Sequence, residues 1–110
     1  MKLRASEEFK TWLENLRDRQ GRSRILSRLF RLADGNPGNS RSVGHGIVEL
    51  KIDFGPGYRV YYIQRGQIFV LLLCGGDKST QAKDIEHARA LANQQIDVEE
   101  DDDGSKDLPF

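Results

Sequence analysis

Apolar residues recur at helical spacing in the first third of the chain. Those between residues 6 and 20 fall three and four apart, and Ser6 precedes them as a helix-capping residue. The same spacing returns in residues 22–33, where arginines occupy other positions. Gly21 separates the two segments, so we expect a helical hairpin. The apolar positions are Phe9, Trp12, Leu13 and Leu16, and then Ile25, Leu26, Leu29, Phe30, Leu32 and Ala33.

The middle of the chain follows a period of two instead. Residues 47–54 alternate between apolar and charged side chains, which predicts a strand with one core face and one wet face. A second alternating run covers residues 58–63, and the unbroken apolar run 68–74 is expected of a strand interior to its sheet. Glycine-containing turns join the three runs, so we expect an antiparallel meander. Residues 34–46 are dense in turn formers and predict an irregular surface loop.

Two glycines follow the apolar run. Gly75 and Gly76 are expected to end that strand and to allow a backbone route closed to other residues. They would deliver Asp77 and Lys78 to the sheet edge beside the strand that carries Arg59. Either residue 79 or residue 80 then caps a last helix, of which residues 83–92 carry the apolar face.

Arg59 is the leading candidate for chemistry. It shares one face of the strand 58–63 with Tyr61, whereas Tyr62 is expected to point into the core. A guanidinium offers several donors in one plane, which suits a phosphate, and Tyr61 could stack on a base. The residues alone leave another interpretation open, because an ion pair with Glu49 or Asp53 across strands would explain Arg59 equally well.

Lys78 is the second candidate. It follows glycines and precedes a helix start, so its ammonium can share an anion with the free N–H groups of that helix. A solvated lysine in a turn is the alternative. The surrounding GGDKST lacks the spacing GxxxxGK[ST], and no βαβ unit is available, which excludes a nucleotide-binding P-loop.

Charge divides the chain into two parts. The formal net charge is zero, but residues 1–96 carry 16 lysines and arginines against 10 acids, a net charge of +6. Residues 97–110 carry a net charge of −6. A basic body suggests a phosphate-rich partner, although a basic surface that only contacts water would also explain this charge. We expect one domain over residues 1–95 and a disordered acidic tail over residues 96–110.

Several classes of protein are excluded by composition. No run approaches the roughly 20 apolar residues that span a bilayer, and no signal-peptide core occurs, so we expect a soluble, intracellular protein. Cys74 lies in an apolar run and is expected to be packed. His45 and His87 are far apart without a spaced carboxylate, so neither a metal site nor a cofactor is expected. Arg41 and His45 precede a strand and are expected to overhang one end of the sheet, His45 as a proton donor or a solvated residue.

Two motifs, GPGYRVYY at residues 55–62 and GGDKSTQ at residues 75–81, carry a family resemblance. Together with the segments between Phe9 and Ala92, they resemble the small toxins of bacterial toxin–antitoxin modules. The resemblance is to the RelE/ParE superfamily, in its phage-derived, HigB-like "addiction module killer protein" branch. It implies an α+β fold in which a helical hairpin packs on a small antiparallel sheet with a short C-terminal helix. It also makes residues 2–4 a first strand.

The same resemblance implies an activity. It suggests a cytoplasmic, metal-independent endonuclease that cuts mRNA on translating ribosomes and is neutralised by a helix-turn-helix antitoxin. Arg59 and Lys78 would be catalytic. RNA contacts would come from Tyr61, Lys51, Arg41 and His45.

Two other functions stay open at this point. ParE-like toxins of the same superfamily poison DNA gyrase by binding and catalyse nothing, and fold does not separate the two activities. The third possibility is an RNA-binding module or an inactivated toxin. A small helix-turn-helix gene beside this one would favour either toxin over the third.

Overall fold

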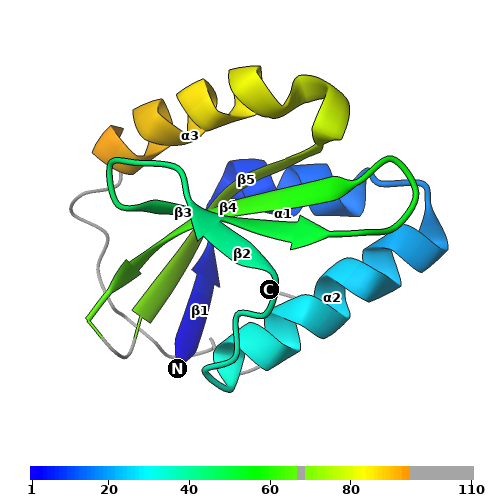
Figure 1. The fold of residues 1–110 in the computed structure, drawn as a ribbon, viewed down its shortest axis with the longest axis horizontal. Helices are drawn as coiled ribbons and strands as arrows, with labels where there is room; N and C mark the ends of the chain where they lie inside the picture. The colour runs from blue at the N-terminus through cyan, green and yellow to red at the C-terminus, as the bar shows by residue number, and fades with distance from the viewer. Residues whose placement is uncertain (67–68, 95–110) are drawn as a thin grey trace.

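A computed structural model describes residues 1–66 and 69–94 as a mixed five-stranded sheet with helices on both faces (Figure 1). Helix α3 covers one face, and α1 and α2 cover the other (Figure 1). The strand order is β1-β5-β4-β3-β2. The elements are β1 (Lys2–Ala5), α1 (Glu7–Glu14), α2 (Arg19–Ala33), β2 (Ser40–Ser42), β3 (Ile47–Ile52), β4 (Tyr58–Arg65), β5 (Phe69–Asp77), the 3-10 helix η1 (Lys78–Thr80) and α3 (Gln81–Gln94).

Helices α1 and α2 begin at side-chain caps. The Ser6 hydroxyl accepts from the Phe9 N–H at 3.0 Å, as the sequence predicts. The Asp18 carboxylate accepts from the Gly21 N–H at 2.9 Å and so caps α2. Gly21 therefore lies in the first turn of α2, and the prediction that it separates two helices is wrong. A Cβ there would meet the Tyr58 ring and the Asp18 carboxylate, so packing requires the glycine.

The meander β3-β4-β5 is antiparallel, as predicted. The expectation of a purely antiparallel sheet is wrong, because β1 pairs parallel with β5 in the register Lys2 to Phe69 and makes the sheet mixed. The expected loop 34–46 also contains a short edge strand, β2, paired with β3. Strand β5 lies between β4 and β1, which confirms that its unbroken apolar run is interior to the sheet.

Strand β5 runs through its two glycines instead of ending at them. Neither glycine has a positive φ, so conformational freedom is not the reason for them. A Cβ at Gly75 would overlap the Trp12 ring, and one at Gly76 would overlap the Asp84 carboxylate. The glycines leave room for neighbouring side chains. Upstream, Tyr61 pairs with Cys74 but Tyr62 pairs with Leu72, so β5 carries a bulge there.

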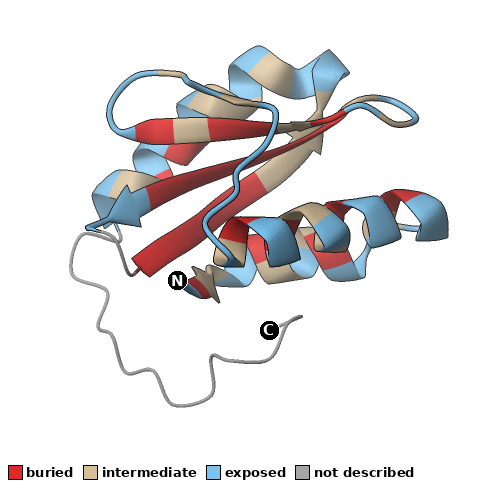
Figure 2. Cartoon of the chain, turned by 60° about the horizontal axis from the view of Figure 1, so that its bottom comes forward, coloured by how far each residue is buried: buried red, intermediate tan, exposed pale blue. Residues whose placement is uncertain are grey.

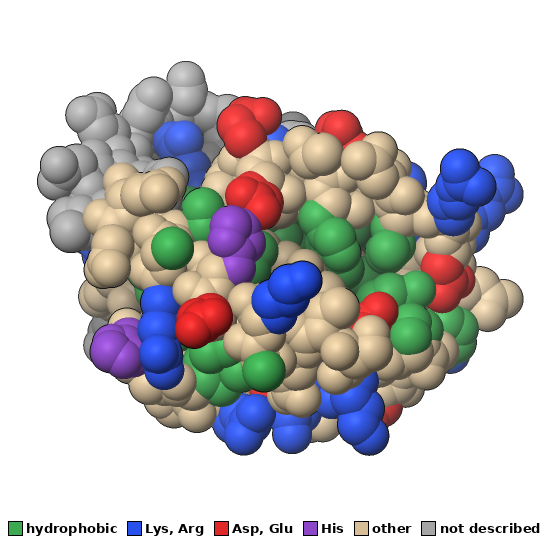
Figure 3. Space-filling model, turned by 90° about the horizontal axis from the view of Figure 1, so that it is seen from above, with side chains coloured by type: hydrophobic (Ala, Val, Ile, Leu, Met, Phe, Trp, Pro, Cys, Tyr) green, Lys and Arg blue, Asp and Glu red, His purple; other side chains and the backbone are tan. Residues whose placement is uncertain are grey.

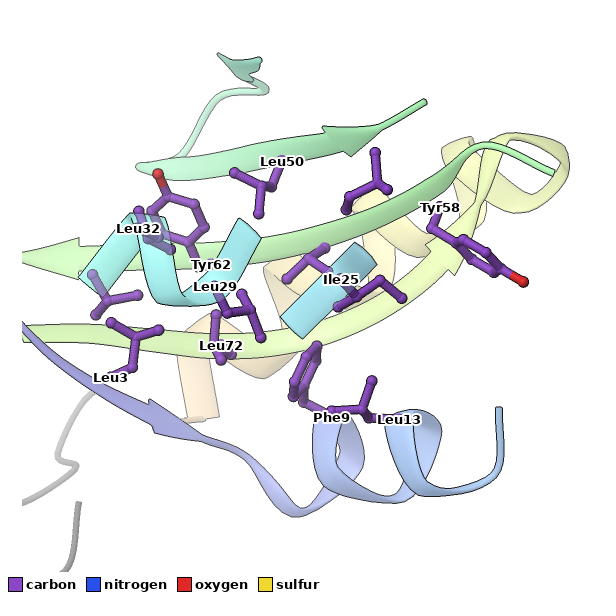
Figure 4. Packing of buried hydrophobic residues seen from close by; sticks show 13 residues of the cluster. Leu3, Phe9, Leu13, Ile25, Leu29, Leu32, Leu50, Tyr58, Tyr62 and Leu72 are labelled. Atoms are coloured by element: carbon purple, nitrogen blue, oxygen red, sulfur yellow. The ribbon is translucent and has the colours of Figure 1, made fainter. Parts of the chain in front are cut away.

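Two apolar clusters lie on opposite faces of the sheet (Figure 2). The first joins β-strand residues to Phe9 and Leu13 of α1 and to Ile25, Leu29 and Leu32 of α2 (Figure 4). Tyr62 belongs to it, as predicted. The second lies under α3, where Ala88 and Leu91 are buried and Ile85 and Ala92 pack against them. These contacts confirm the predicted apolar face of the last helix.

Some expectations fall outside this description. The predicted domain boundary at residue 95 and the acidic tail at 96–110 lie outside the described residues. Within the residues that are described, no helix is both long and apolar enough to cross a bilayer.

Candidate functional site

Arg59 lies at the start of β4, between Lys51 of β3 and Gly76 of β5 in the register of the sheet. Only 7% of its surface is exposed, so Arg59 does not stand on an open sheet face. Its neighbour Gly76 has no side chain, and the space beside it is filled by Asp84 and Thr80 from α3 and η1. The guanidinium is thus enclosed on the side of α3.

The hydrogen bonds of Arg59 hold it toward the end of its own strand. Its Nη1 donates to the carbonyl oxygens of Gly57 at 3.1 Å and Tyr58 at 3.2 Å. Its buried Nε has no hydrogen-bond partner, and the nearest carboxylate oxygen, Oε2 of Glu49, is 3.9 Å away. The ion pair with Glu49 is therefore loose. An arginine this buried with an unused donor is unusual, because buried polar groups are nearly always satisfied.

Arg59 and Lys78 line the same open depression, of about 320 Å³. The 53–57 turn between β3 and β4 forms its wall, with Gly57 between the two cations. A Cβ at Gly57 would lie 3.3 Å from Cβ of Lys78 and 3.4 Å from Nη1 of Arg59, and the residue has a φ of +82°. Only glycine fits both constraints. The predicted approach of Lys78 to the Arg59 strand is confirmed, whereas the roles of both residues stay predictions.

The backbone of Lys78 is fixed by its neighbours, and its side chain is exposed. Asp77 caps η1: its carboxylate accepts from the Ser79 N–H at 2.8 Å, and the Thr80 hydroxyl closes a capping box. Asp77 thus caps the 3-10 turn that leads into α3, whereas the sequence analysis placed the cap of the last helix at residue 79 or 80. Among the described residues, the Lys78 ammonium has no ion-pair partner, so its charge is available to a ligand.

Glu49 is the centre of a buried polar network beside this depression. It is fully buried, although the sequence places it on a wet face. Its carboxylate accepts from Arg41 Nε at 2.8 Å, Tyr61 Oη at 2.9 Å and Gln81 Nε2 at 2.7 Å. Burial alone would raise the pKa of Glu49, but these donors outweigh it and lower the pKa from its ordinary value.

This network corrects the expectation for Tyr61. The ring is fully buried under α3 with its hydroxyl on Glu49, and burial together with that bond raises the pKa of Tyr61. It offers no face to a base. Arg41 is half exposed, but its Nε is engaged by Glu49. Alternation alone cannot show that a helix from the end of the chain covers this face.

His45 and Lys51 lie in different places. Lys51 is half-buried and directly opposite Arg59, so it adds a third cation near the depression. His45 is exposed in the turn before β3, with a φ of +57°. The first residue of β3 and Lys51 are four positions apart, about 13 Å along a strand. His45 therefore overhangs the opposite end of the sheet from Arg59 and Lys78.

Phe54 is the aromatic residue that the sequence analysis missed. It lines the depression, and the guanidinium carbon of Arg24 lies 4.5 Å above its ring centroid. Such a cation–π pair holds the ring in place. The signal in the sequence is its position directly before the GPG turn, since β3 ends at Ile52 and Phe54 lies in the turn that follows.

Two other kinds of site find no support in the described part of the chain. No three His, Cys, Asp or Glu side chains come together there in a way that could hold a metal. Cys74 is buried, as predicted, and burial raises the pKa of its thiol to about 12. A thiol with that pKa is protonated at neutral pH and is a poor nucleophile.

The carboxylates give a testable pH dependence of stability. The folded-state pKa of Glu49 lies below its ordinary value despite desolvation, because Arg41, Gln81 and Tyr61 donate to it. The pKa of Asp18 is also lowered, because the Gly21 N–H and the Tyr58 hydroxyl donate to it. A lowered folded-state pKa stabilises above the unfolded value, and that stabilisation is lost as pH falls through the folded value.

We therefore expect the free energy of unfolding to be level from neutral pH to about pH 5 and to fall below about pH 4. Urea unfolding at a series of pH values measures it. The Glu49→Gln variant should show a shallower fall, and an equally steep fall in that variant would contradict the assignment to Glu49.

Comparison with known proteins gives two matches. The profile of a family described as "Phage derived protein Gp49-like (DUF891)" matches residues 11–97, which include every residue of the site. An uncharacterized protein of Haemophilus influenzae is 45% identical over 94 residues, covering 86% of this chain and 95% of the relative. The similarity therefore extends over most of the chain.

Proposed function

The chain belongs to the phage-derived Gp49-like family, and from that premise we propose that it is the toxin of a type II toxin–antitoxin module. In this proposal it has a RelE/ParE-like fold of the HigB-like branch. It cuts mRNA on translating ribosomes in the cytoplasm, without a metal, and a helix-turn-helix antitoxin neutralises it. The toxin domain covers residues 1–95, and residues 96–110 form an acidic tail.

One observation carries the proposal: a buried guanidinium with an unused donor stands beside a free ammonium at an open depression. Arg59 and Lys78 bring two positive charges to the same depression, within reach of one ligand. A phosphate matches both, since a guanidinium binds it through several donors and an ammonium binds it as a point charge. Lys51 lies opposite Arg59 and extends the positive charge along the sheet.

These cations suit cleavage by the RNA's own 2′-hydroxyl. The 2′-hydroxyl loses its proton as its oxygen bonds to the adjacent phosphorus, the bond from phosphorus to the 5′ oxygen breaks, and that 5′ oxygen takes up a proton. Arg59 and Lys78 stabilise the extra negative charge on the five-coordinate phosphorus, which is the largest contribution such groups make. The products carry a 2′,3′-cyclic phosphate and a free 5′-hydroxyl.

The positions of four other residues suggest further contacts with RNA. Phe54 replaces Tyr61 as the aromatic surface on which a base next to the scissile phosphate stacks. Lys51 contacts the backbone near that phosphate. Arg41 and His45 are proposed contacts for more distant nucleotides, because Arg41 is shared with Glu49 and His45 lies at the other end of β3.

The test is to map transcript 5′ ends after brief induction and to analyse the ends made by purified protein and ribosomes. We expect new 5′-hydroxyl ends within translated regions and 2′,3′-cyclic phosphates, with cleavage undiminished by EDTA at a magnesium level that keeps ribosomes intact. Full loss of cleavage on chelation of other divalent metals would overturn the mechanism. Uncut transcripts together with broken DNA would instead assign the protein to gyrase poisons.

A further inference from the structure

Strand β5 has an unpaired edge over its last five residues. Its partner β1 ends at Ala5, which pairs with Leu72. Beyond that point, Ser6 alone reaches β5, through its N–H to the Leu72 carbonyl at 3.0 Å and its hydroxyl to the Leu73 carbonyl at 2.7 Å. From there to Asp77, β5 has β4 on one side and no described strand on the other.

This edge forms the floor of a groove of about 540 Å³, which we call the edge groove. Helix α1 forms one wall and α3 the other. Figure 3 shows acidic, basic and apolar side chains together on the α3 side of the molecule. Trp12 stands against Gly75, where a Cβ would collide with its ring. The lining residues are Glu7, Glu8, Thr11, Trp12, Cys74, Gly75, Asp84 and His87.

The edge groove is acidic, in contrast to the depression at Arg59. Three carboxylates line it, and His87, held to Glu8 at 2.5 Å, is the only basic side chain among its lining residues. Glu7 reaches Lys10 at 3.7 Å, but its own side chain is 91% exposed. A nucleic acid would be repelled here, whereas a cationic ligand would be attracted.

We propose that the edge groove binds an extended, cationic segment of a partner protein as a sixth strand of the sheet. The unpaired edge supplies main-chain donors and acceptors for strand addition. Side chains of an added strand alternate between the two walls. Basic ones at every second position face the α1 wall, where they meet Glu7 and Glu8 and lay their aliphatic stems over Trp12, and the side chains between them face the α3 wall.

This inference does not depend on the proposed RNA cleavage. The edge groove lies across β5 from β4, and it is opposite in charge to the Arg59 depression. A partner strand and RNA therefore occupy separate places. The test below contains no RNA, so its failure leaves the proposed activity untouched.

Trp12 gives a direct readout because it is the single tryptophan of the chain. The probe is an end-capped peptide of about seven residues, a usual strand length, with alternating lysine and valine. We expect it to shift the fluorescence of Trp12 and to slow amide hydrogen exchange in residues 73–77. A peptide with alternating glutamate and valine should not bind. Methylation of alternate backbone nitrogens of the lysine peptide should weaken its binding at least tenfold.

Matched variants separate the effect of the acidic charges in the edge groove from any general effect of a substitution on the protein. Replacing Glu7 and Glu8 together by glutamine should weaken the lysine peptide roughly three- to tenfold at low salt, since exposed charges each contribute modestly. Glu14→Gln, on the same helix but outside the edge groove, should leave binding unchanged. Circular dichroism checks that each variant is folded.

Three outcomes would overturn the proposal. They are equal binding of the lysine and glutamate peptides, no effect of backbone methylation, or slowed exchange elsewhere than residues 73–77. Self-association that protects the same residues would assign the edge groove to a second copy of this chain and would also overturn it.

Discussion

Replacing Arg59 by alanine should reduce RNA cleavage at least about 100-fold, the loss typical of removing one preorganised charge donor from a transition state. The guanidinium is fixed by the carbonyls of Gly57 and Tyr58, and its Nε is unused. Because these bonds hold the guanidinium at the depression, its charge needs little reorganisation to meet a phosphate bound there. The measurement is the single-turnover cleavage rate on programmed ribosomes.

Stability must be measured in the same variant, because Arg59 is almost completely buried. Two carbonyls lose a donor, so unfolding should become easier by about 1–2 kcal/mol, which a domain of this size tolerates. Arg89→Ala, which removes an exposed cation from α3, is the matched control and should cut RNA normally. If cleavage by Arg59→Ala falls only as far as its folded fraction falls, Arg59 is a structural residue.

Arg59→Lys refines the result. It keeps the positive charge but offers a compact ammonium in place of a planar fork. We expect cleavage between that of the alanine variant and that of the natural protein. Full activity would mean that the charge alone is needed and that the planar fork of donors has no part in binding.

The sequence predicted the helices and strands of this fold better than it predicted which helix covers each face of the sheet. Helical and alternating periods are local, so the residues facing the core in α1, α2 and β3 could be identified from them. The covering of the other sheet face is not local: α3 begins more than 20 residues after Arg59. This is why Glu49 and Tyr61 were predicted to be wet and are buried.

The site itself was predictable in part for the same reason. Arg59 and Lys78 are brought together by two neighbouring strands whose pairing follows from a short turn, so their approach could be inferred. The Glu49 network joins β2, β3, β4 and α3, and no short pattern encodes it. Gly75 and Gly76 show a further limit, because a glycine needed for space looks the same in sequence as one needed for flexibility.

The Glu49 network gives the largest expected effect on stability. Glu49→Ala removes the shared acceptor of Arg41, Tyr61 and Gln81, and the Tyr61 hydroxyl is left buried. The Tyr61 hydroxyl stays dehydrated without a partner, which costs about 1–3 kcal/mol, whereas the half-exposed Arg41 regains water and adds little. A loss of that size is a large share of the total for a small domain. Urea unfolding at pH 7 measures it.

Two comparisons identify the cause of that loss. Glu14→Ala, at an exposed position of α1, should change the free energy of unfolding by less than about 0.5 kcal/mol. Glu49→Gln keeps the shape and one acceptor oxygen, so it should be less damaging than alanine. Because Glu49 also lies 3.9 Å from Arg59, the folded Glu49→Gln variant separates two roles. Normal RNA cleavage would confine Glu49 to stability, whereas slower cleavage at full folding would show that its charge positions Arg59.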